Sequence, residues 1–324
     1  MRDITYREAL REAMREEMRR DESVFQLGED IGPFGGAYKV TLGLSEEFGK
    51  TRMLDTPLAE AGIAGAAVGA AIVGMRPIAE IMYMDFSTIA SDMIINLASK
   101  IRFMTAGGVK VPVVFRTQEG GGVSAGPQHS QCLEAMYLNT PGLVIVMPST
   151  PYDAKGLLKS AIREDNPVLF IEHKNLYNTR GPVPEEEYLV PLGKADIKRE
   201  GKDITVVAIS KGVVLALEAA EVLAQEGISL EIVDPMTIKP LDDETIIKSV
   251  QKTGKLMIVH EAHRTGGFGA EVAALVADKA FDYLDAPIKR LAALDSPVPF
   301  GLGLESFVLP TAKDVVEAAR SMCE

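Results

Sequence analysis

Two side chains of this sequence are placed to move protons, and the first is Glu60. It opens a segment made almost entirely of Ala, Gly, Ile and Val, with no cationic residue close to it in the chain. A carboxylic acid in apolar surroundings has a raised pKa and can share a proton with a bound group. Glycines at 62, 65 and 69 would weaken an isolated helix, so we expect another backbone to pack closely against it. The alternative is an ordinary first-turn glutamate, which the helix dipole stabilises by about 0.3–1 kcal/mol.

The second is His129, at the end of a glycine-rich loop over residues 118–131. The loop follows a predicted strand over 111–116 and precedes a predicted helix over 130–138. A loop after a parallel strand lies at the carboxyl edge of the sheet, where α/β proteins bind ligands. An imidazole changes charge near neutral pH, which makes His129 a candidate acid or base. The alternative is a flexible loop that carries an incidental histidine.

Motifs that hold phosphates or metals are missing from the sequence. It contains neither Gly-x-x-x-x-Gly-Lys nor the Gly-Asp-Gly stretch with a downstream Asn by which thiamine enzymes hold magnesium and pyrophosphate. Gly267 and Gly269 precede a predicted helix, but the third glycine of a dinucleotide loop is absent. His260 and His263 have no clear set of further metal ligands. We therefore expect that this chain does not hold the phosphates of a ligand at Glu60.

Short apolar strands alternate with helical segments along the chain, which is typical of an α/β fold. The strands are continuous apolar runs, as in a parallel sheet covered on both faces. In the first half we predict strands over 24–27, 77–82, 111–116, 143–147 and 168–171, and helices over 60–73, 87–104, 130–138 and 152–163. An amphipathic helix is predicted over 1–20, with Leu10, Met14 and Met18 on its apolar side.

The alternation stops after residue 173, where several prolines and an acidic triplet at 185–187 indicate a linker. It restarts with predicted strands over 204–209, 228–233, 256–260 and 288–292, and helices over 213–225, 243–250, 270–280 and 312–322. We predict two parallel-sheet α/β domains, at 1–185 and 203–324, joined by a linker at 186–202.

Composition narrows the class of protein. The 324 residues carry a formal net charge of −12, which argues against a nucleic-acid partner and permits a basic protein partner. No apolar run approaches the roughly 20 residues that cross a bilayer, so no membrane role is expected. The first 20 residues are rich in both Arg and Glu, unlike a transit peptide. Cys132 and Cys323 lie far apart and are expected to be reduced thiols, so we predict a cytoplasmic protein.

Several short motifs in order give the chain a close resemblance to a known family. From Tyr6 to about Ala319 it resembles the beta subunit of the thiamine-diphosphate-dependent decarboxylase component of 2-oxo acid dehydrogenase complexes, and the related acetoin dehydrogenase beta subunit. The motifs are Gly28-Glu29-Asp30, Gly36-Ala37-Tyr38-Lys39-Val40, Asp55-Thr56-Pro57 with Glu60, Gln128-His129-Ser130-Gln131, Pro141-Gly142-Leu143, Asp153-Ala154-Lys155-Gly156-Leu157 and Thr265-Gly266-Gly267-Phe268-Gly269.

The resemblance implies half of an active site. This chain would be a pyrimidine-binding domain followed by a transketolase C-terminal-like domain. An alpha subunit would hold magnesium and pyrophosphate, in a heterotetramer of two alpha and two beta chains. The family's pyrimidine-activating acid falls on Glu60, and the histidine near the reacting carbon and the lipoyl entrance falls on His129. Leu58, Met82 and Phe86 fall on positions that line the pyrimidine pocket.

The resemblance also implies a structural potassium ion and a second protein partner. The ion would be held largely by backbone carbonyls, at positions that fall on Val113, Ala161, Ile162, Glu164 and Asn166. In relatives the C-terminal domain docks the small basic binding domain of a lipoyl acyltransferase. The acidic balance of this chain and the Glu324 carboxylate suit such a partner.

Two other functions fit parts of the pattern. One is the C-terminal half of a split transketolase, which shares both folds, although the motifs around His129 and Asp153 favour the dehydrogenase family. The other is a non-catalytic dimerisation subunit, which would make Glu60 and His129 incidental. The substrate stays open among pyruvate, branched 2-oxo acids and acetoin. The stretch Met147-Pro148-Ser149-Thr150-Pro151-Tyr152-Asp153 leans toward the acetoin or branched-chain groups.

Overall fold

The computed structural model describes residues 1–324, which divide into two compact units. The first unit comprises residues 1–119 and 137–192, and the second comprises 120–136 and 193–324. Each is described by itself. The glycine-rich loop with His129 therefore groups with the C-terminal residues, and not with the strand that it follows.

The first unit contains most of the strands predicted in the N-terminal half, with additional short elements. Its strands are β1 (Arg2–Thr5), β2 (Val24–Gly28), β3 (Met53–Asp55), β4 (Arg76–Ile81), β5 (Val114–Glu119), β6 (Val144–Val146), β7 (Val168–His173) and β8 (Arg180–Val183). Its helices are α1 (Tyr6–Arg20), α2 (Leu44–Phe48), α3 (Glu60–Ile72), η1 (Met84–Thr88), η2 (Met93–Ala98), α4 (Ser99–Met104), α6 (Pro151–Arg163) and η3 (Lys174–Leu176).

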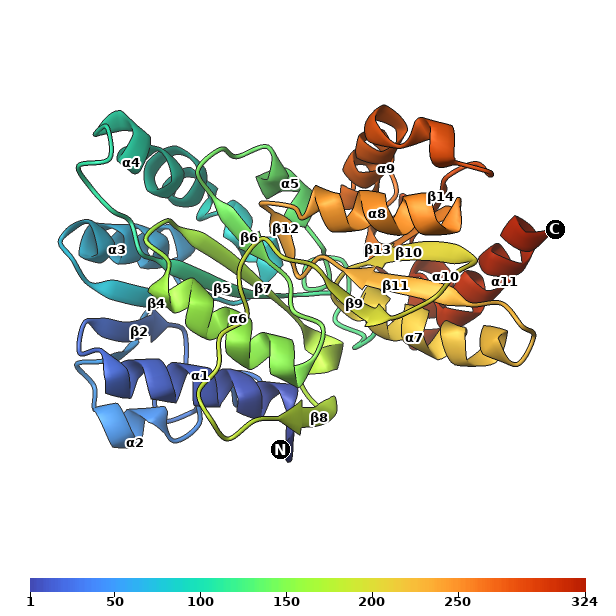
Figure 1. Cartoon of the computed structure of the whole chain (residues 1–324). Coiled ribbons are helices and arrows are strands. Elements are labelled where there is room, and N and C mark those ends of the chain that lie inside the picture. Colours follow the sequence, from blue (N-terminus) through green and yellow to red (C-terminus); the bar gives the residue numbers. More distant parts are fainter. The chain divides into compact units, whose positions relative to one another are not determined.

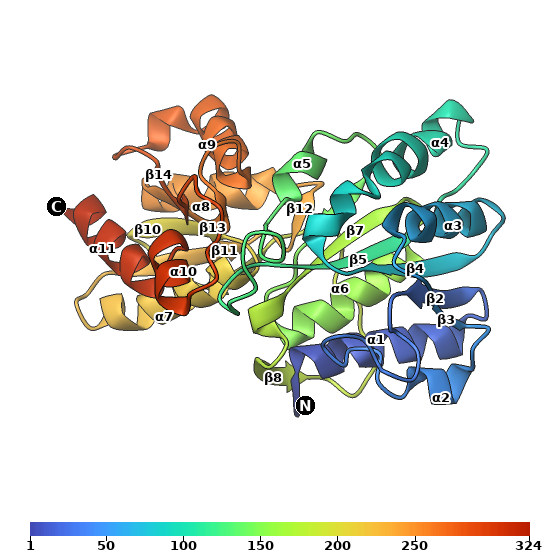
Figure 2. The same ribbon diagram turned by 180° about the vertical axis from the view of Figure 1, so that it is seen from behind.

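The main sheet of the first unit is parallel, as predicted. Its strands follow the order β6-β7-β5-β4-β2-β3, and every pair among them is parallel. Helices α3 and α4 lie on one face of this sheet, and α1 and α6 lie on the other (Figures 1 and 2). Strands β2, β5 and β7 are buried along their whole length, as expected for a parallel sheet covered on both faces.

Helix α1 confirms the amphipathic segment but begins later than predicted. Leu10, Met14 and Met18 are fully buried. Thr5 and Glu8 form a capping box that starts the helix, and the residues before it form β1. Strand β1 pairs antiparallel with β8, near residue 180, so only the folded chain reveals it.

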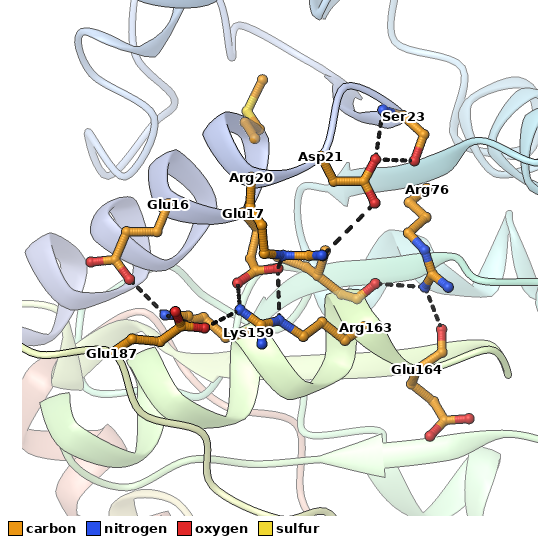
Figure 3. A network of polar contacts seen from close by, with 12 residues as sticks. Glu16, Glu17, Arg20, Asp21, Ser23, Arg76, Lys159, Arg163, Glu164 and Glu187 are labelled. Atoms are coloured by element: carbon orange, nitrogen blue, oxygen red, sulfur yellow. Dashed lines mark hydrogen bonds and ion pairs between the residues drawn. The ribbon is translucent and has the colours of Figure 1, made fainter.

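A charged network joins α1 to α6, and Figure 3 shows it from close by. Lys159 is buried and donates to Glu16 at 2.7 Å, while Arg163 donates to Glu17 at 2.6 Å. Glu17 is itself fully buried. A buried charge persists only when it is paired, so this network fixes the two helices against each other.

The predicted helix over 87–104 is broken in the structure. It divides into η1, the π-helical η2 and α4. The hydroxyls of Ser87 and Thr88 donate to backbone carbonyls three residues earlier, and such local bonds compete with a regular α-helix.

The second unit is a smaller parallel sheet with one antiparallel edge strand. The sheet order is β14-β13-β10-β11-β9. Its elements, with α5 at the boundary of the units, are α5 (Glu134–Leu138), β9 (Asp196–Arg199), β10 (Ile204–Ala208), α7 (Lys211–Ala224), β11 (Leu230–Asp234), β12 (Thr237–Lys239), α8 (Asp243–Thr253), β13 (Leu256–His263), α9 (Phe268–Lys279), η4 (Phe281–Tyr283), β14 (Lys289–Ala293), α10 (Leu302–Val308) and α11 (Ala312–Cys323).

Strand β9 lies inside the segment predicted as a linker, and it pairs antiparallel with β11. Helices α7 and α11 cover one face of the second sheet, and α8 and α9 cover the other (Figures 1 and 2). None of the helices in residues 1–324 is both long enough and apolar enough to span a bilayer.

Candidate active site

The carboxyl edge of the first sheet carries a row of acidic residues. Gly28 at the end of β2 is in register with Asp55 on β3 and with Glu80 on β4. Glu29 follows β2 directly, and Glu60 follows β3 after a short turn. Parallel strands bring their carboxyl ends to one edge, so residues from three separate segments meet there.

Glu60 is the first residue of α3, and it is only half-buried within this chain. Ala59 occupies the N-cap position and offers no side-chain hydrogen bond. Leu58, just before the helix, is 79% exposed. A large apolar side chain so exposed beside an acid suggests a surface that another group covers.

Met82 and Phe86 belong to the same edge because they follow β4. Met82 comes just after the strand, and Phe86 lies in η1; both are half-buried. The structure thus places Glu60, Leu58, Met82 and Phe86 in one unit, after strands β3 and β4, which flank β2, or at the start of α3. His129 belongs to the second unit.

Glu29 is the middle residue of the Gly28-Glu29-Asp30 motif, and the structure gives it a larger importance. It is 3% exposed, and neither of its carboxyl oxygens has a hydrogen-bond partner. Burial raises the pKa of Glu29 from 4.5 to about 7, with further contributions from the charges of Glu60, Asp30 and Glu80. A buried acid without partners, next to a second acid, is typical of a functional site. The only indication in the sequence was that Glu29 closely follows a predicted strand, where ligand-binding residues of α/β proteins lie.

A buried ion-pair cluster underlies this edge. Arg116 on β5 donates two hydrogen bonds to Glu172 on β7, at 2.6 and 2.8 Å, and a third to Glu80 on β4 at 2.8 Å. All three side chains are almost wholly buried. The planar guanidinium holds both carboxylates in a fixed geometry, so the strands that carry the site are locked in register.

His129 follows a loop whose amides already bind carboxylates. The amide of Gly121 donates to Glu261 at 2.6 Å, and the amides of Gly122 and Ser124 donate to Glu305 at 3.2 and 3.1 Å. The loop is therefore an ordered structure within the second unit. His129 is half-buried, and its own amide donates to the Gly126 carbonyl at 3.3 Å.

A cavity of about 480 Å³ in the second unit adjoins the residues that flank His129. Pro127, Ser130 and Cys132 line one part of it, and Glu261 and Asp295 line another. Buried Glu134 lies near Glu261, and burial raises the pKa of Glu134 to about 7. Glu134 could not be recognised from local sequence, because its burial depends on packing between distant segments.

The five residues expected at a potassium site also lie near one another, around the end of α6 and the start of β7. The carbonyl of Val113 accepts from the Val168 amide at 2.9 Å, and Arg76 donates to the carbonyls of Ile162 and Glu164 at 2.9 and 3.0 Å (Figure 3). Carbonyl oxygens suit potassium, and each has two lone pairs, so one acceptor position remains beside each bond. An ion at these carbonyls would share them with a guanidinium.

The chemistry of the first unit's edge suits the pyrimidine end of thiamine diphosphate and not its phosphates. Glu60 supplies an acid, and Leu58, Met82 and Phe86 supply apolar surface. Asp30 and Asp55 are further acidic groups at this edge, and like charge repels a diphosphate. Across residues 1–324, the His, Cys, Asp and Glu side chains form no group of three or more that could hold a metal ion.

Comparison with known proteins assigns both units to domain families. Residues 2–180 match the transketolase pyrimidine-binding domain, and residues 193–315 match the transketolase C-terminal domain. The chain is also similar to a solved structure described as a split-gene transketolase, an inactive beta4 tetramer. That similarity has a TM-score of 0.80 at 24% identity and covers 98% of each chain. It confirms the predicted fold of two parallel-sheet α/β domains.

Relatives with higher identity include proteins named as dehydrogenase or oxidoreductase beta subunits. The pyruvate dehydrogenase E1 component subunit beta of Rickettsia felis is 49% identical, covering 99% of this chain and 98% of the relative. The 2-oxoisovalerate dehydrogenase subunit beta of Bacillus subtilis is 49% identical and covers 99% of both. The acetoin:2,6-dichlorophenolindophenol oxidoreductase subunit beta of Bacillus subtilis is 48% identical, covering 97% and 96%. The chain therefore belongs to the beta-subunit family of 2-oxo acid and acetoin dehydrogenases, in which the decarboxylase component depends on thiamine diphosphate.

Proposed function

We propose that this chain supplies the aminopyrimidine half of a thiamine-diphosphate site, and that an alpha subunit completes the site in a heterotetramer of two alpha and two beta chains. The observation that carries the proposal is the half-buried Glu60 beside exposed Leu58, at an edge rich in acidic residues. The alpha subunit would hold the diphosphate and magnesium. The reaction would be oxidative decarboxylation of a 2-oxo acid, or cleavage of acetoin, with transfer of the acyl group to lipoamide.

Thiamine diphosphate, when bound, would supply the nucleophilic carbon and the electron sink. Glu60 would hold a proton at the pyrimidine ring nitrogen through a charge-assisted hydrogen bond. Leu58, Met82 and Phe86 would pack against the ring and exclude water, which strengthens that bond. Glu29, whose raised pKa leaves it partly protonated at neutral pH, would limit the negative charge beside Glu60.

His129 would act in the transfer of the acyl group, by donating or orienting a proton at the lipoyl sulfur. Its place at the end of an ordered loop supports this role, since a proton donor must be held in a defined position.

Replacement of the key acid tests the proposal. In the assembled enzyme, Glu60→Gln keeps the size of the side chain but cannot share its proton, and turnover should be abolished. Exposed Glu22→Gln changes the net charge equally and should leave turnover unchanged. Near-normal turnover of a correctly assembled Glu60→Gln enzyme would refute the role given to Glu60.

The relatives do not select one substrate for this chain. Proteins named for pyruvate, 2-oxoisovalerate and acetoin are 49%, 49% and 48% identical to this chain, so overall similarity does not select one. Assays of the alpha–beta assembly with pyruvate, branched 2-oxo acids and acetoin would identify the substrate by the ratio of kcat/KM values.

The second unit would dock the basic binding domain of a lipoyl acyltransferase. Glu324 is exposed at the end of α11, and the chain is acidic overall. A carboxylate at a docking surface strengthens binding of a basic partner, more so at low salt. Removal of Glu324 alone should weaken acyltransferase binding; unchanged binding at low ionic strength would count against this surface.

A further inference from the structure

The glycine-rich loop before His129 has the geometry of an anion-binding site. Gly120, Gly122, Ser124 and Gly126 all have positive φ angles, between 56° and 94°. Such alternation turns neighbouring backbone N–H groups toward one side, and these concave sets of amides bind anions. In many proteins the anion is a phosphate group of a ligand.

Here the anions come from the chain itself. Glu305 on α10 accepts hydrogen bonds from the amides of Gly122 and Ser124, and it is 1% exposed. Glu261 on β13 accepts from the amide of Gly121 at 2.6 Å. Three loop amides are thereby occupied by two carboxylates from elements far along the sequence.

Glu261 also contacts the segment on the other side of His129. The Cys132 thiol donates a weak S–H···O hydrogen bond to the same carboxylate oxygen, with a sulfur–oxygen distance of 3.9 Å. One side chain therefore touches the chain both before and after His129.

The loop packs closely against side chains that flank α10. A Cβ atom added at Gly121 would lie 2.8 Å from Leu309, and one added at Gly126 would lie 2.3 Å from the Phe300 ring. The loop therefore contacts the residues that flank α10, and its amides are hydrogen-bonded to Glu305 and Glu261.

We propose that Glu305 and Glu261 form a two-carboxylate clamp by which the C-terminal domain positions the loop and, through it, His129. The two acids are positioning residues, because they act through His129. The inference rests on the proposed function of His129 in acyl transfer. It also implies that this loop does not bind the phosphates of a ligand, since its amides are taken.

The clamp can be tested first by a measurement that does not depend on activity. Amide hydrogen exchange of residues 120–126 should be at least about tenfold faster in Glu305→Ala than in the native chain, because the amides of Gly122 and Ser124 lose their acceptor. Glu305→Gln keeps an acceptor oxygen and should exchange at an intermediate rate. The control is Glu317→Ala, an exposed acid on α11, which should not change exchange in the loop. Unchanged exchange in Glu305→Ala would overturn the clamp.

The second measurement separates the two steps of the reaction in the assembled enzyme. Glu305→Ala should reduce kcat/KM for acylation of a lipoyl domain by about 10–100-fold, the scale of a misplaced catalytic group, and reduce decarboxylation with an artificial electron acceptor much less. Glu305→Gln should restore most of the acylation rate. Equal losses in both steps, or no rescue by Gln, would mean a structural role only and would overturn the positioning role.

A double variant distinguishes this inference from the proposed function itself. If Glu305 acts through His129, adding Glu305→Ala to His129→Ala should cause little further loss of acylation. Independent, multiplying losses would overturn the coupling. If His129→Ala alone leaves acylation intact, the role of His129 fails and the positioning inference fails with it, while fast exchange in Glu305→Ala would still establish the clamp.

Discussion

Glu29 offers a quantitative test of the electrostatics at the candidate site. Burial and nearby acids raise the pKa of this carboxyl from 4.5 to about 7 in the folded chain. Between these pH values the folded state keeps a proton that the unfolded state has released. The free energy of unfolding therefore falls as the pH rises from 4.5 to 7 and stays lower above 7. Glu29→Gln has no proton to release, so its stability should lack this decrease.

The magnitude follows from the two pKa values. The folded and unfolded pKa values differ by about 2.5, and each pKa unit corresponds to about 1.36 kcal/mol, so the free energy of unfolding changes by at most about 3.4 kcal/mol. Screening by nearby solvent reduces this change to about 1–2 kcal/mol. Glu29→Gln should therefore gain about 1–2 kcal/mol relative to the native chain on going from pH 4.5 to pH 8. A gain in stability on removing a functional acid is a common consequence of strained active sites.

The assay is urea unfolding at pH 4.5 and pH 8, followed by circular dichroism because the chain contains no tryptophan. Amide exchange of β2 assigns the change to the first unit. Exposed Glu22→Gln is the matched control and should show no pH-dependent gain. If Glu29→Gln and Glu22→Gln behave alike at both pH values, Glu29 is not an uncompensated buried acid and the electrostatic account of this edge is refuted.

Three further predictions concern other parts of the chain. His129→Ala should impair acylation of a lipoyl domain more than decarboxylation, and equal loss of both rates would refute its assigned step. Arg116→Met should destabilise the first unit by about 3–5 kcal/mol in urea unfolding, because Glu80 and Glu172 would be buried without their cation; a loss below about 1 kcal/mol would contradict the cluster's importance. Exchanging choline chloride for KCl at equal ionic strength should raise the midpoint of thermal unfolding, by about 2–4 °C for each kcal/mol of binding energy; identical midpoints would remove the potassium proposal for Val113, Ala161, Ile162, Glu164 and Asn166.

The sequence predicted those features that depend on local pattern. The predicted strands over 24–27 and 168–171 lie within β2 and β7, whereas the predicted strand over 111–116 overlaps only the first half of β5. The spacing of Leu10, Met14 and Met18 predicted the buried face of α1. Predicted boundaries differed by a few residues where side-chain hydroxyls or capping boxes intervene. The free energies of these local hydrogen bonds are small compared with the free energy of burial, so the exact ends of elements are difficult to predict from sequence.

Features that depend on contacts between distant residues were missed. The pairing of β1 with β8 was not predicted, nor was β9 within the expected linker. The grouping of residues 120–136 with the second unit rests on hydrogen bonds such as Gly121 to Glu261 and Gly122 to Glu305, which span 140 and 183 residues. Local composition shows a glycine loop there, but not which carboxylates hold it.

The candidate site was predictable only where it depends on local pattern. Glu60 stands out because a lone acid precedes a segment of small apolar residues, and the motifs around it place the chain in its family. The isolation of Glu29 was not predictable, because it results from β3 and β4 closing on either side of β2.

The most direct measurement of the central claim is calorimetric binding of thiamine diphosphate with magnesium, together with turnover of pyruvate, a branched 2-oxo acid and acetoin. Both should be measured for this chain alone and for the chain with its alpha subunit. The chain alone should show neither binding nor turnover, because its edge offers an acid and apolar side chains, while the guanidinium of Arg116 is already paired with Glu80 and Glu172. Addition of the alpha subunit should produce both. Tight binding and full turnover by the chain alone would contradict the claim that it is half of an active site.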